Sequence, residues 1–498
     1  MSSGPRVLVL GGGLAGVTAA LDCAEAGARV TLLEVRRRLG GAAYSVQRGG
    51  LEMDNGQHVF LRCCTAYRGL LERLGSQRHV SIQPRLAIPV LSPGSPPVML
   101  RRGSLPAPLH LAGALARYRH LTPLQRLGAA RAALALMRLR GSEEELDRET
   151  LGVWLARHGQ SQAAIDALWD LIALPTLNVR AAEASLSLGA FVFQTGLFGE
   201  ADAGDVGFHV GTLAATIGEP AGRALAHAGV EVRLGWRAEA VESGAGGLSV
   251  RARGGSAEAE TGDDEDAPTG ISGADAEAGT GDGLQADAVV VALPHARAAR
   301  LLEPLLGERA SRWQGLGSSP IVNLHVVYDR RVFDLDFAAG VRTPVQYLFD
   351  RTAAAGAPAG CQYLAVSLSG ADREMAMSVD ALRERYVPAL EQLLPRARGA
   401  RLESFLVTRE HAATFRAAPG TASLRPAAAT SVPGLVLAGT WTATGWPATL
   451  ESAVLSGHSA AREALRAVGL AGGGAGETLG GVAPSGPARR ARVGVGAR

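Results

Sequence analysis

The sequence contains no lysine, because every one of its 50 Lys+Arg residues is an arginine. Schiff-base catalysis and the phosphate-binding P-loop both depend on a lysine, so both are excluded. The formal net charge is only +3 over 498 residues, which argues against a nucleic-acid partner. The four cysteines form no C-x-x-C pair and no zinc-like spacing with histidine. We therefore expect neither a disulfide framework nor a metal site.

Long apolar runs are also absent. No stretch is long and apolar enough to predict a transmembrane helix, and the run at 7–10 stops at glycines too early for a signal peptide. The expected location is cytoplasmic. Over 110–140, arginines and leucines recur at helical spacing, with Pro123 between two helices. This stretch is either an ordinary surface helix pair or a peripheral contact with the inner face of the cytoplasmic membrane.

Two segments lack the apolar residues that a folded core needs. Residues 253–283 are rich in Gly, Ala and Thr and include an acidic run at 263–266, and residues 471–498 are rich in Gly, Pro and Ala. Such compositions cannot bury enough apolar surface to offset the entropy lost on ordering. We predict a disordered acidic insertion and a disordered tail.

A strand–turn–helix pattern near the N terminus predicts a dinucleotide site. The apolar run at 7–10 leads into Gly11, Gly13 and Gly16, which form a G-x-G-x-x-G motif, and then into a helix over 17–26. The first glycine of this motif permits a tight turn, the second admits a pyrophosphate, and the third lets helix and strand pack closely. The helix N terminus then favours the phosphates.

The next segment indicates which dinucleotide is bound. Glu34 ends the following strand, 18 residues after Gly16, where a carboxylate can accept hydrogen bonds from a ribose. Arg38, Gly40 and Gly41 follow in an R-x-G-G pattern that resembles the second FAD-contacting motif of the amine oxidase and phytoene desaturase superfamily. Two alternatives are an arginine site for the phosphate of NADP, which Glu34 would repel, and an ordinary surface arginine cluster.

A third segment resembling that superfamily lies near the C terminus. A strand at 435–438 runs into Gly439 and Thr440, and a helix follows over 448–467. In the superfamily, a strand, a Gly-Asp pair and a helix N terminus hold the flavin, and the helix end faces the part of the ring that carries negative charge when reduced. Thr440 stands where the acid usually lies. Three separated motifs together predict FAD as the cofactor.

A narrower resemblance covers residues 5–467. The segments 54–58, 151–155, 174–178 and 445–453 resemble the squalene-associated FAD-dependent desaturase family. The resemblance assigns these residues to the cofactor: Gly11, Gly13, Leu14, Ala15, Gly16, Glu34, Arg38, Gly40, Gly41, Gly56, Gln57, His58, Ala238, Gly439, Thr440, Pro447, Ala448 and Thr449.

The resemblance also implies a reaction, the reductive dehydroxylation of hydroxysqualene to squalene in squalene and hopanoid biosynthesis. Such an enzyme needs an apolar channel for a polyisoprenoid, an acid to help water leave, and an electron donor, which the sequence does not identify. His58 is the acid we would name, since an imidazole titrates near neutral pH. Asp54, Tyr347 and Tyr363 are other candidates, and a structural role for His58 beside the cofactor is the alternative.

Three other functions stay open. A carotenoid or phytoene desaturase would run the flavin chemistry in the opposite direction. An amine oxidase often has an aromatic pair facing the flavin, and aromatic residues make up only 5% of this chain. A non-catalytic FAD-binding protein could deliver a squalene precursor to a partner.

The expected fold class is α/β. A Rossmann-like FAD-binding domain of the amine oxidase/phytoene desaturase type should comprise residues 1–75, 205–300 and 415–470. A discontinuous α+β substrate domain, which would face the membrane, should comprise 76–204 and 301–414. Within it, residues 148–200 should be mainly helical, with a break at Pro175.

Overall fold

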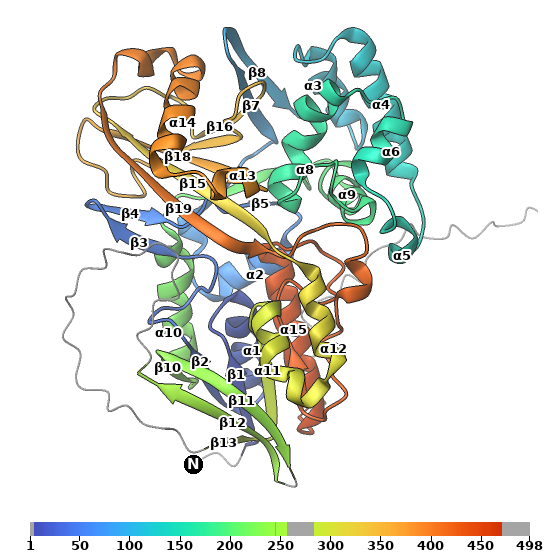
Figure 1. Cartoon of the computed structure of the whole chain (residues 1–498), viewed down its shortest axis with the longest axis vertical. Coiled ribbons are helices and arrows are strands. Elements are labelled where there is room, and N and C mark those ends of the chain that lie inside the picture. The colour runs from blue at the N-terminus through green and yellow to red at the C-terminus, as the bar shows by residue number, and fades with distance from the viewer. Residues whose placement is uncertain (1–3, 245, 256–282, 471–498) are drawn as a thin grey trace, which may run out of the picture.

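The structure is a computed structural model that describes residues 4–244, 246–255 and 283–470. It has two lobes, one above the other in Figure 1. The lower lobe contains helix α1 (Leu14–Glu25) and helix α15 (Leu450–Ala467), which come from opposite ends of the sequence. The predicted tail and nearly all of the predicted acidic insertion lie outside the described residues, so those two predictions stay predictions.

A parallel β-sheet forms the centre of the lower lobe, with the strand order β10-β2-β1-β14-β20. The strands are β1 (Arg6–Leu10), β2 (Arg29–Glu34), β10 (Glu231–Leu234), β14 (Ala288–Val291) and β20 (Leu435–Leu437). In register, Leu8 of β1 pairs with Val289 of β14. The predicted Rossmann-like α/β class is confirmed, and its strands come from widely separated parts of the chain.

Both faces of the parallel sheet are covered, which explains why its strands are apolar without alternation. Val7 and Val9 of β1 pack with α1, α15, α2 (Thr65–Arg73) and α10 (Glu219–His227). Leu8 and Leu10 belong to the opposite face, with residues of β12 and α11. This second layer consists of α11 (His295–Leu306) and the antiparallel strands β11 (Trp236–Gly244), β12 (Gly247–Gly254) and β13 (Leu284–Ala286).

The upper lobe is built on a mixed sheet with the order β19-β15-β18-β17-β16-β7-β8. Its strands are β7 (Ala87–Ser92), β8 (Ser95–Arg101), β15 (Ser319–Tyr328), β16 (Phe337–Gly340), β17 (Tyr347–Asp350), β18 (Gln362–Ser369) and β19 (Leu402–Thr414). Val322, Leu324 and Val326 of β15 pack in one cluster with α14 (Val379–Leu393), which covers this face of the sheet.

Smaller strands connect the lobes. The hairpin β3 (Ser45–Arg48) and β4 (Leu51–Asp54) follows the parallel strand β2 along the chain. The strands β5 (Val59–Leu61), β6 (Val80–Ile82) and β9 (Val206–His209) form another antiparallel sheet in the order β5-β9-β6.

Helices α3–α9 form a further part of the upper lobe. They are α3 (Ala112–Arg117), α4 (Pro123–Arg138), α5 (Glu143–Leu146), α6 (Leu151–Arg157), α7 (Gln162–Ala164), α8 (Asp170–Leu177) and α9 (Leu186–Phe193). Pro123 begins α4, as predicted. The predicted break at Pro175 is wrong, because α8 continues to Leu177. Proline cannot donate to the carbonyl four residues before it, and the hydroxyl of Tyr347 donates to that Leu171 carbonyl instead, at 2.8 Å.

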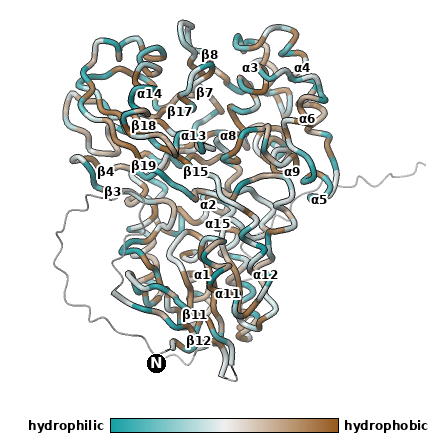
Figure 2. Tube along the Cα trace, in the orientation of Figure 1, coloured by the Kyte–Doolittle hydropathy of each residue, from teal (hydrophilic) through white to brown (hydrophobic). Residues whose placement is uncertain are grey.

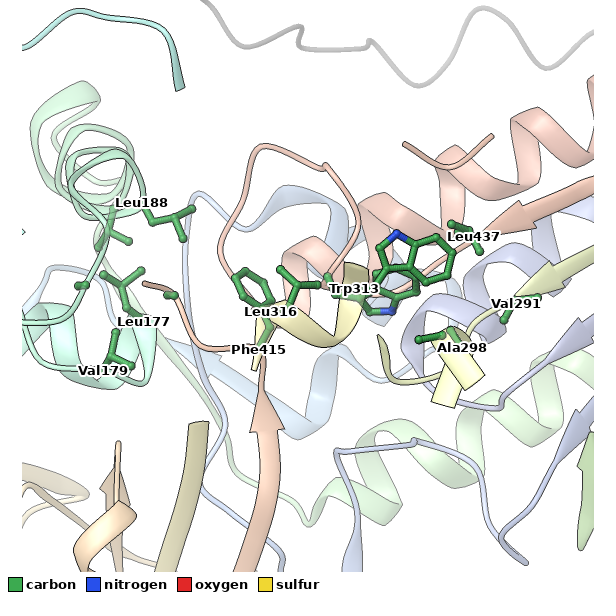
Figure 3. Close-up of a cluster of buried hydrophobic side chains, with 14 of the residues drawn as sticks. Leu177, Val179, Leu188, Val291, Ala298, Trp313, Leu316, Phe415 and Leu437 are labelled. Atoms are coloured by element: carbon green, nitrogen blue, oxygen red, sulfur yellow. The ribbon is translucent and has the colours of Figure 1, made fainter. Parts of the chain in front are cut away.

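A continuous apolar core connects the two lobes. Figure 3 follows it from the upper lobe to the lower lobe through Leu177, Val179, Leu188, Phe415, Leu316, Trp313, Ala298, Val291 and Leu437. The rings of Trp313 and Trp441 lie 5.0 Å apart between centroids. Figure 2 shows hydrophobic residues along the inner segments of both lobes. Helices α11 and α12 (Glu308–Ser311) lie in the lower lobe, and the chain enters the upper lobe at β15.

Candidate active site

Residues 11–16, which comprise the link between β1 and α1 and the first three residues of α1, form what we call the glycine turn. Gly11 has a φ of +108°, and a Cβ there would lie 2.5 Å from the carbonyl oxygen of Ala292. A Cβ on Gly16 would lie 1.9 Å from the carbonyl oxygen of Gly11. At Gly13, by contrast, a Cβ would meet only the Cα of Gly41, at 3.6 Å. Gly11 and Gly16 therefore permit close packing, whereas Gly13 leaves one side of the backbone open.

The open side of Gly13 coincides with the N terminus of α1. Gly13 is the N-cap residue, so no side chain caps this helix end. The first N–H groups of a helix have no partner within it, and the helix dipole gives this end a partial positive charge. A Cβ on Gly41 would lie 2.7 Å from the Cα of Gly13, so two bare backbones meet at this point. This open helix end suits a pyrophosphate, the central group of FAD, which the N–H groups of Leu14 and Ala15 would hold.

Glu34 lies at the end of β2, against the glycine turn. Its side chain is buried, and it accepts hydrogen bonds from the N–H groups of Gly12 at 2.6 Å and Arg36 at 2.8 Å. A carboxylate has about four acceptor positions, so capacity remains for ribose hydroxyls. Arg38 lies over the ring of Tyr44, with its Cζ 3.4 Å from the ring centroid, and burial lowers the pKa of Arg38 to about 10.

Gly40 and the turn before β11 reach this same region. The N–H of Gly40 donates to the carbonyl of Gly12 at 2.9 Å. Ala238 lies in β11 beside a bulge, and the turn before β11 contacts the segment after Glu34, where the N–H of Gly235 donates to the Arg36 carbonyl at 3.3 Å. The structure thus brings the predicted residues of the first two motifs to the C-terminal ends of β1 and β2.

Residues 439–449 connect β20 to α15 and contain the third motif. Gly439 has a φ of +134°, and its N–H donates to the Ser456 hydroxyl at 2.9 Å. Thr449, which follows Pro447 and Ala448, is the N-cap of α15, because its hydroxyl accepts from the N–H of Ser452 at 3.2 Å. The segment therefore leads into the N terminus of a long helix, whose dipole favours negative charge at that point.

Arg425 holds this segment in place, and no sequence motif indicated it. Its Nη2 donates to the carbonyls of Thr442 and Trp446, both at 2.7 Å, and to that of Thr440 at 3.3 Å. Burial lowers its pKa to about 10, and its Nη1 is buried with no hydrogen-bond partner among the described residues. Arg425 thus fixes the path of the loop and places a buried positive charge beside it.

Residues 54–58, which begin at the last residue of β4, form what we call the seam turn, because they lie where the two lobes meet. Asp54 pairs with Arg351 of the upper lobe at 2.8 Å, and their side chains are only 3% and 9% exposed. The carbonyl of Asn55 accepts from Nδ2 of Asn323 in β15, also at 2.8 Å. The turn is therefore positioned by polar side chains that come from the opposite lobe.

His58 ends the seam turn. Its Nδ1 lies 3.1 Å from the Gly56 carbonyl, an arrangement in which Nδ1 donates and Nε2 is left as an acceptor. Burial lowers the pKa of His58, so the neutral form dominates at neutral pH. Its backbone carbonyl lies 2.8 Å from Nδ1 of His209, whose Nε2 lies 2.7 Å from the Tyr67 hydroxyl. The lowered pKa argues against His58 as the proton donor, and that role stays a prediction.

The other candidate acids are engaged in structural bonds. Asp54 accepts two further hydrogen bonds besides its ion pair with Arg351. The hydroxyl of Tyr347 donates to the Leu171 carbonyl, and that of Tyr363 lies 2.6 Å from Nδ1 of His325. Burial raises the pKa of both tyrosines, which makes them weak proton donors.

Solved structures of other proteins share this fold. A putative protoporphyrinogen oxidase from Exiguobacterium sp. 255-15 superposes with a TM-score of 0.64 at 18% identity, covering 93% of this chain and 98% of that one. A putrescine oxidase gives a TM-score of 0.64 at 17% identity, covering 93% and 99%. The fold is that of the FAD-dependent oxidases.

The family follows from the sequence. The family described as flavin containing amine oxidoreductase matches residues 14–465, and the chain belongs to it. The protein is an FAD-dependent oxidoreductase, as predicted. Hydroxysqualene dehydroxylases from Rhodopseudomonas palustris and Sinorhizobium fredii are each 29% identical to it, covering 93% and 92% of this chain and 98% of each relative. A probable zeta-carotene desaturase from Synechococcus elongatus is 23% identical, covering 94% of this chain and all of that one.

Proposed function

We propose that the protein reduces hydroxysqualene to squalene, with reduced FAD as the reductant and water and oxidised FAD as the other products. The observation that carries this proposal is the similarity to hydroxysqualene dehydroxylases along almost the whole chain. A third such enzyme, from Zymomonas mobilis, is 25% identical to this chain. Overall, hydroxysqualene and FADH2 give squalene, water and FAD: one C–O bond breaks, and a C–H bond forms at the same carbon.

We propose that FAD lies between the glycine turn and residues 439–449. The N terminus of α1 would bind the pyrophosphate and Glu34 a ribose, while the N terminus of α15, with Arg425 behind it, would stabilise negative charge on the reduced ring. When bound, FAD supplies the hydride. The chain supplies orientation and a dry environment. Phe191 of α9 contributes to that environment, because its ring lies 4.9 Å from that of Trp446 between centroids.

A second candidate is a carotenoid desaturase, which oxidises its substrate. It is favoured by the full-length similarity to the zeta-carotene desaturase of S. elongatus, at lower identity than the dehydroxylases. Both candidates act on long isoprenoids, so we propose a polyisoprenoid substrate in either case. An amine substrate is supported by the description of the family and by the fold shared with a putrescine oxidase.

We also propose that helix α4 docks on an anionic membrane surface. No helix in the described ranges is both long and apolar enough to cross a membrane. On α4, however, Leu124, Leu127 and Leu134 are 78%, 55% and 42% exposed, and exposed Arg131 and Arg138 share their face of the helix. The buried residues of α4 lie on the opposite face. A solvent-facing stripe of leucine and arginine suits the boundary between acyl chains and anionic headgroups.

The direction of the reaction is tested with the purified holoenzyme. Reduced anaerobically with dithionite in D2O, so that N5 of the flavin carries deuterium, and then given hydroxysqualene, it should form squalene with deuterium on the carbon that lost the hydroxyl. Protein that leaves hydroxysqualene unchanged, yet oxidises zeta-carotene when its flavin is oxidised, would be a desaturase.

The same assay tests His58. If His58 is the proton donor, His58→Ala should slow squalene formation by about 10²–10⁴-fold. If it only supports the seam turn, as its lowered pKa favours, the rate per bound FAD should change little.

Membrane docking is tested by flotation with vesicles that contain phosphatidylglycerol. The pair Leu124→Glu and Leu127→Glu should abolish flotation, and Arg131→Glu with Arg138→Glu should weaken it, while activity on detergent-dispersed substrate persists. Val379→Glu on α14 is the matched control, because Val379 is 42% exposed on a different helix. Equal flotation of all variants would contradict the proposal.

A further inference from the structure

The face of β15 that is turned toward the seam turn carries polar side chains. Val322, Leu324 and Val326 pack on the α14 side, so the alternate residues Asn323 and His325 belong to the opposite face. Both are completely buried. Such residues normally satisfy their hydrogen-bonding groups, and any that do not call for an explanation.

His325 is fully satisfied. Its Nδ1 lies 2.6 Å from the Tyr363 hydroxyl, and its Nε2 lies 3.0 Å from the Thr408 hydroxyl. Burial lowers its pKa to about 4, so it is held neutral between these two partners. His325 therefore has a structural role.

Asn323 is only half satisfied. Its Nδ2 donates to the Asn55 carbonyl at 2.8 Å, but its Oδ1 is buried with no hydrogen-bond partner among the described residues. A buried acceptor without a partner carries a free-energy cost, because it has lost its hydrogen bonds to water without replacement. Support of the Asn55 carbonyl does not explain why an asparagine stands here. Thr408 also donates to that carbonyl, at 3.1 Å, so the carbonyl would keep a partner without Asn323.

A second unpartnered amide lies on the same turn. Nε2 of Gln57 is buried and has no partner in the described part of the chain. Gly56, directly before it, has no side chain. A Cβ at that position would lie 3.8 Å from both Oδ1 of Asn323 and Cε1 of His58, and 3.3 Å from Nδ2 of Asn323. The backbone of Gly56 therefore lies close to the unpartnered acceptor Oδ1 of Asn323. The next residue in the sequence, Gln57, carries the unpartnered donor Nε2.

We propose that Asn323 and Gln57 bind the hydroxyl group of the substrate and so select an isoprenoid alcohol over the hydrocarbon of the same skeleton. A hydroxyl donates one hydrogen bond, which Oδ1 of Asn323 accepts, and accepts others, one of which Nε2 of Gln57 donates. A hydrocarbon leaves both amide atoms unpaired, and such a site discriminates strongly against a ligand that lacks the polar group. This inference rests on the proposed function for the carbon skeleton of the ligand.

The test compares hydroxysqualene with squalene on the full-length holoenzyme. Binding is followed by the change in flavin absorbance, and turnover by squalene formation. Asn323→Leu should retain its FAD but lower kcat/KM for hydroxysqualene by about 10- to 100-fold. It should also lose the preference for binding hydroxysqualene over squalene. Gln57→Leu should act in the same direction.

Two further variants separate hydroxyl binding from support of the seam turn. Thr408→Val removes the other donor to the Asn55 carbonyl and should change kcat/KM less than about twofold per bound FAD. Asn323→Asp keeps an acceptor that Asn323→Leu lacks. When its carboxyl group is protonated, it can also donate to the Asn55 carbonyl, so its activity should rise toward that of the wild type as pH falls.

Several outcomes would overturn the inference. One is an Asn323→Leu enzyme with wild-type kcat/KM and an unchanged binding preference. Another is loss of FAD in step with activity, which would place the amide against the cofactor. If the wild type does not turn over hydroxysqualene, the proposed function fails. The inference is then still judged by binding, since the wild type should prefer the alcohol and Asn323→Leu should not.

Discussion

The glycine turn and the seam turn are held in shape in opposite ways. The glycine turn relies on backbone groups and on the absence of side chains, because a Cβ on Gly16 would lie 1.9 Å from the Gly11 carbonyl oxygen. The seam turn relies on side chains from the other lobe, such as Arg351 on Asp54 and Asn323 on the Asn55 carbonyl. The glycine turn should therefore be sensitive to substitutions that add side-chain volume. The seam turn should be sensitive to the loss of a hydrogen-bonding or ion-pair partner in the upper lobe.

The largest effect is expected at Gly16. Gly16→Ala forces a methyl group against backbone that cannot move aside, so we expect the free energy of unfolding to fall by more than about 4 kcal/mol, with loss of FAD. Gly13→Ala meets only the Gly41 Cα at 3.6 Å, so the apoprotein should stay stable while FAD binding weakens. Urea unfolding and flavin content separate the two. A soluble Gly16→Ala protein with full FAD would contradict this account of the glycine turn.

Next in size is the buried ion pair of the seam turn. Arg351→Met leaves the Asp54 carboxylate buried without its counter-charge, which should lower the free energy of unfolding by about 3–5 kcal/mol. The control is Arg330→Ala at the pair Arg330–Asp329, whose side chains are 58% and 20% exposed. That change should lower the free energy of unfolding far less than Arg351→Met does, because solvent screens an exposed pair. Equal losses measured by urea unfolding would show that burial does not distinguish the pairs.

Acid should weaken the seam more than the glycine turn. Burial lowers the pKa of His209 to about 3 and that of His325 to about 4. Below pH 6.5 these histidines bind protons in the unfolded chain but stay neutral in the folded protein, so the free energy of unfolding falls as pH falls. Each histidine should remove about 2 kcal/mol between pH 8 and pH 5. Urea midpoints across this range should fall less steeply in His325→Asn than in the wild type, whereas Gly13→Ala should keep the wild-type slope.

The last expected effect is on FAD affinity and concerns the charge beside the glycine turn. Glu34→Ala should weaken FAD binding by about 1.5–3 kcal/mol, the range for a hydrogen bond to a charged group. Fluorescence titration of the apoprotein with FAD measures this change. Unchanged affinity would mean that Glu34 serves only the N–H groups of Gly12 and Arg36.

The glycine turn could be predicted from the sequence because its parts are local. Gly11, Gly13 and Gly16 lie within one turn of chain, and Glu34 follows at the spacing that a strand–helix–strand unit imposes. The strand at 435–438 and the helix after it were predicted by the same kind of short pattern. In each case, the residues that interact are close together in the sequence.

The seam turn could not be predicted in this way. Asn323 lies 268 residues from the Asn55 carbonyl that it contacts, and Glu410, which accepts from the side chain of Asn55, lies 355 residues away. Only the sheet of the upper lobe brings them together. Pro175 shows the same limit, because the hydroxyl that satisfies the carbonyl freed by proline comes from Tyr347, 176 residues beyond Leu171. Arg425 belongs to no recognisable motif.

The apolar core drawn in Figure 3 has a mechanical consequence. Lobes that swing apart need a thin or wet boundary between them, and a broad hydrophobic contact prevents such motion. The continuous hydrophobic cluster that runs from Leu177 through Phe415 and Trp313 to Leu437 holds the two lobes in a fixed arrangement. A bulky ligand must then enter and leave through local shifts of helices and loops in the upper lobe, and the two halves should melt in one step.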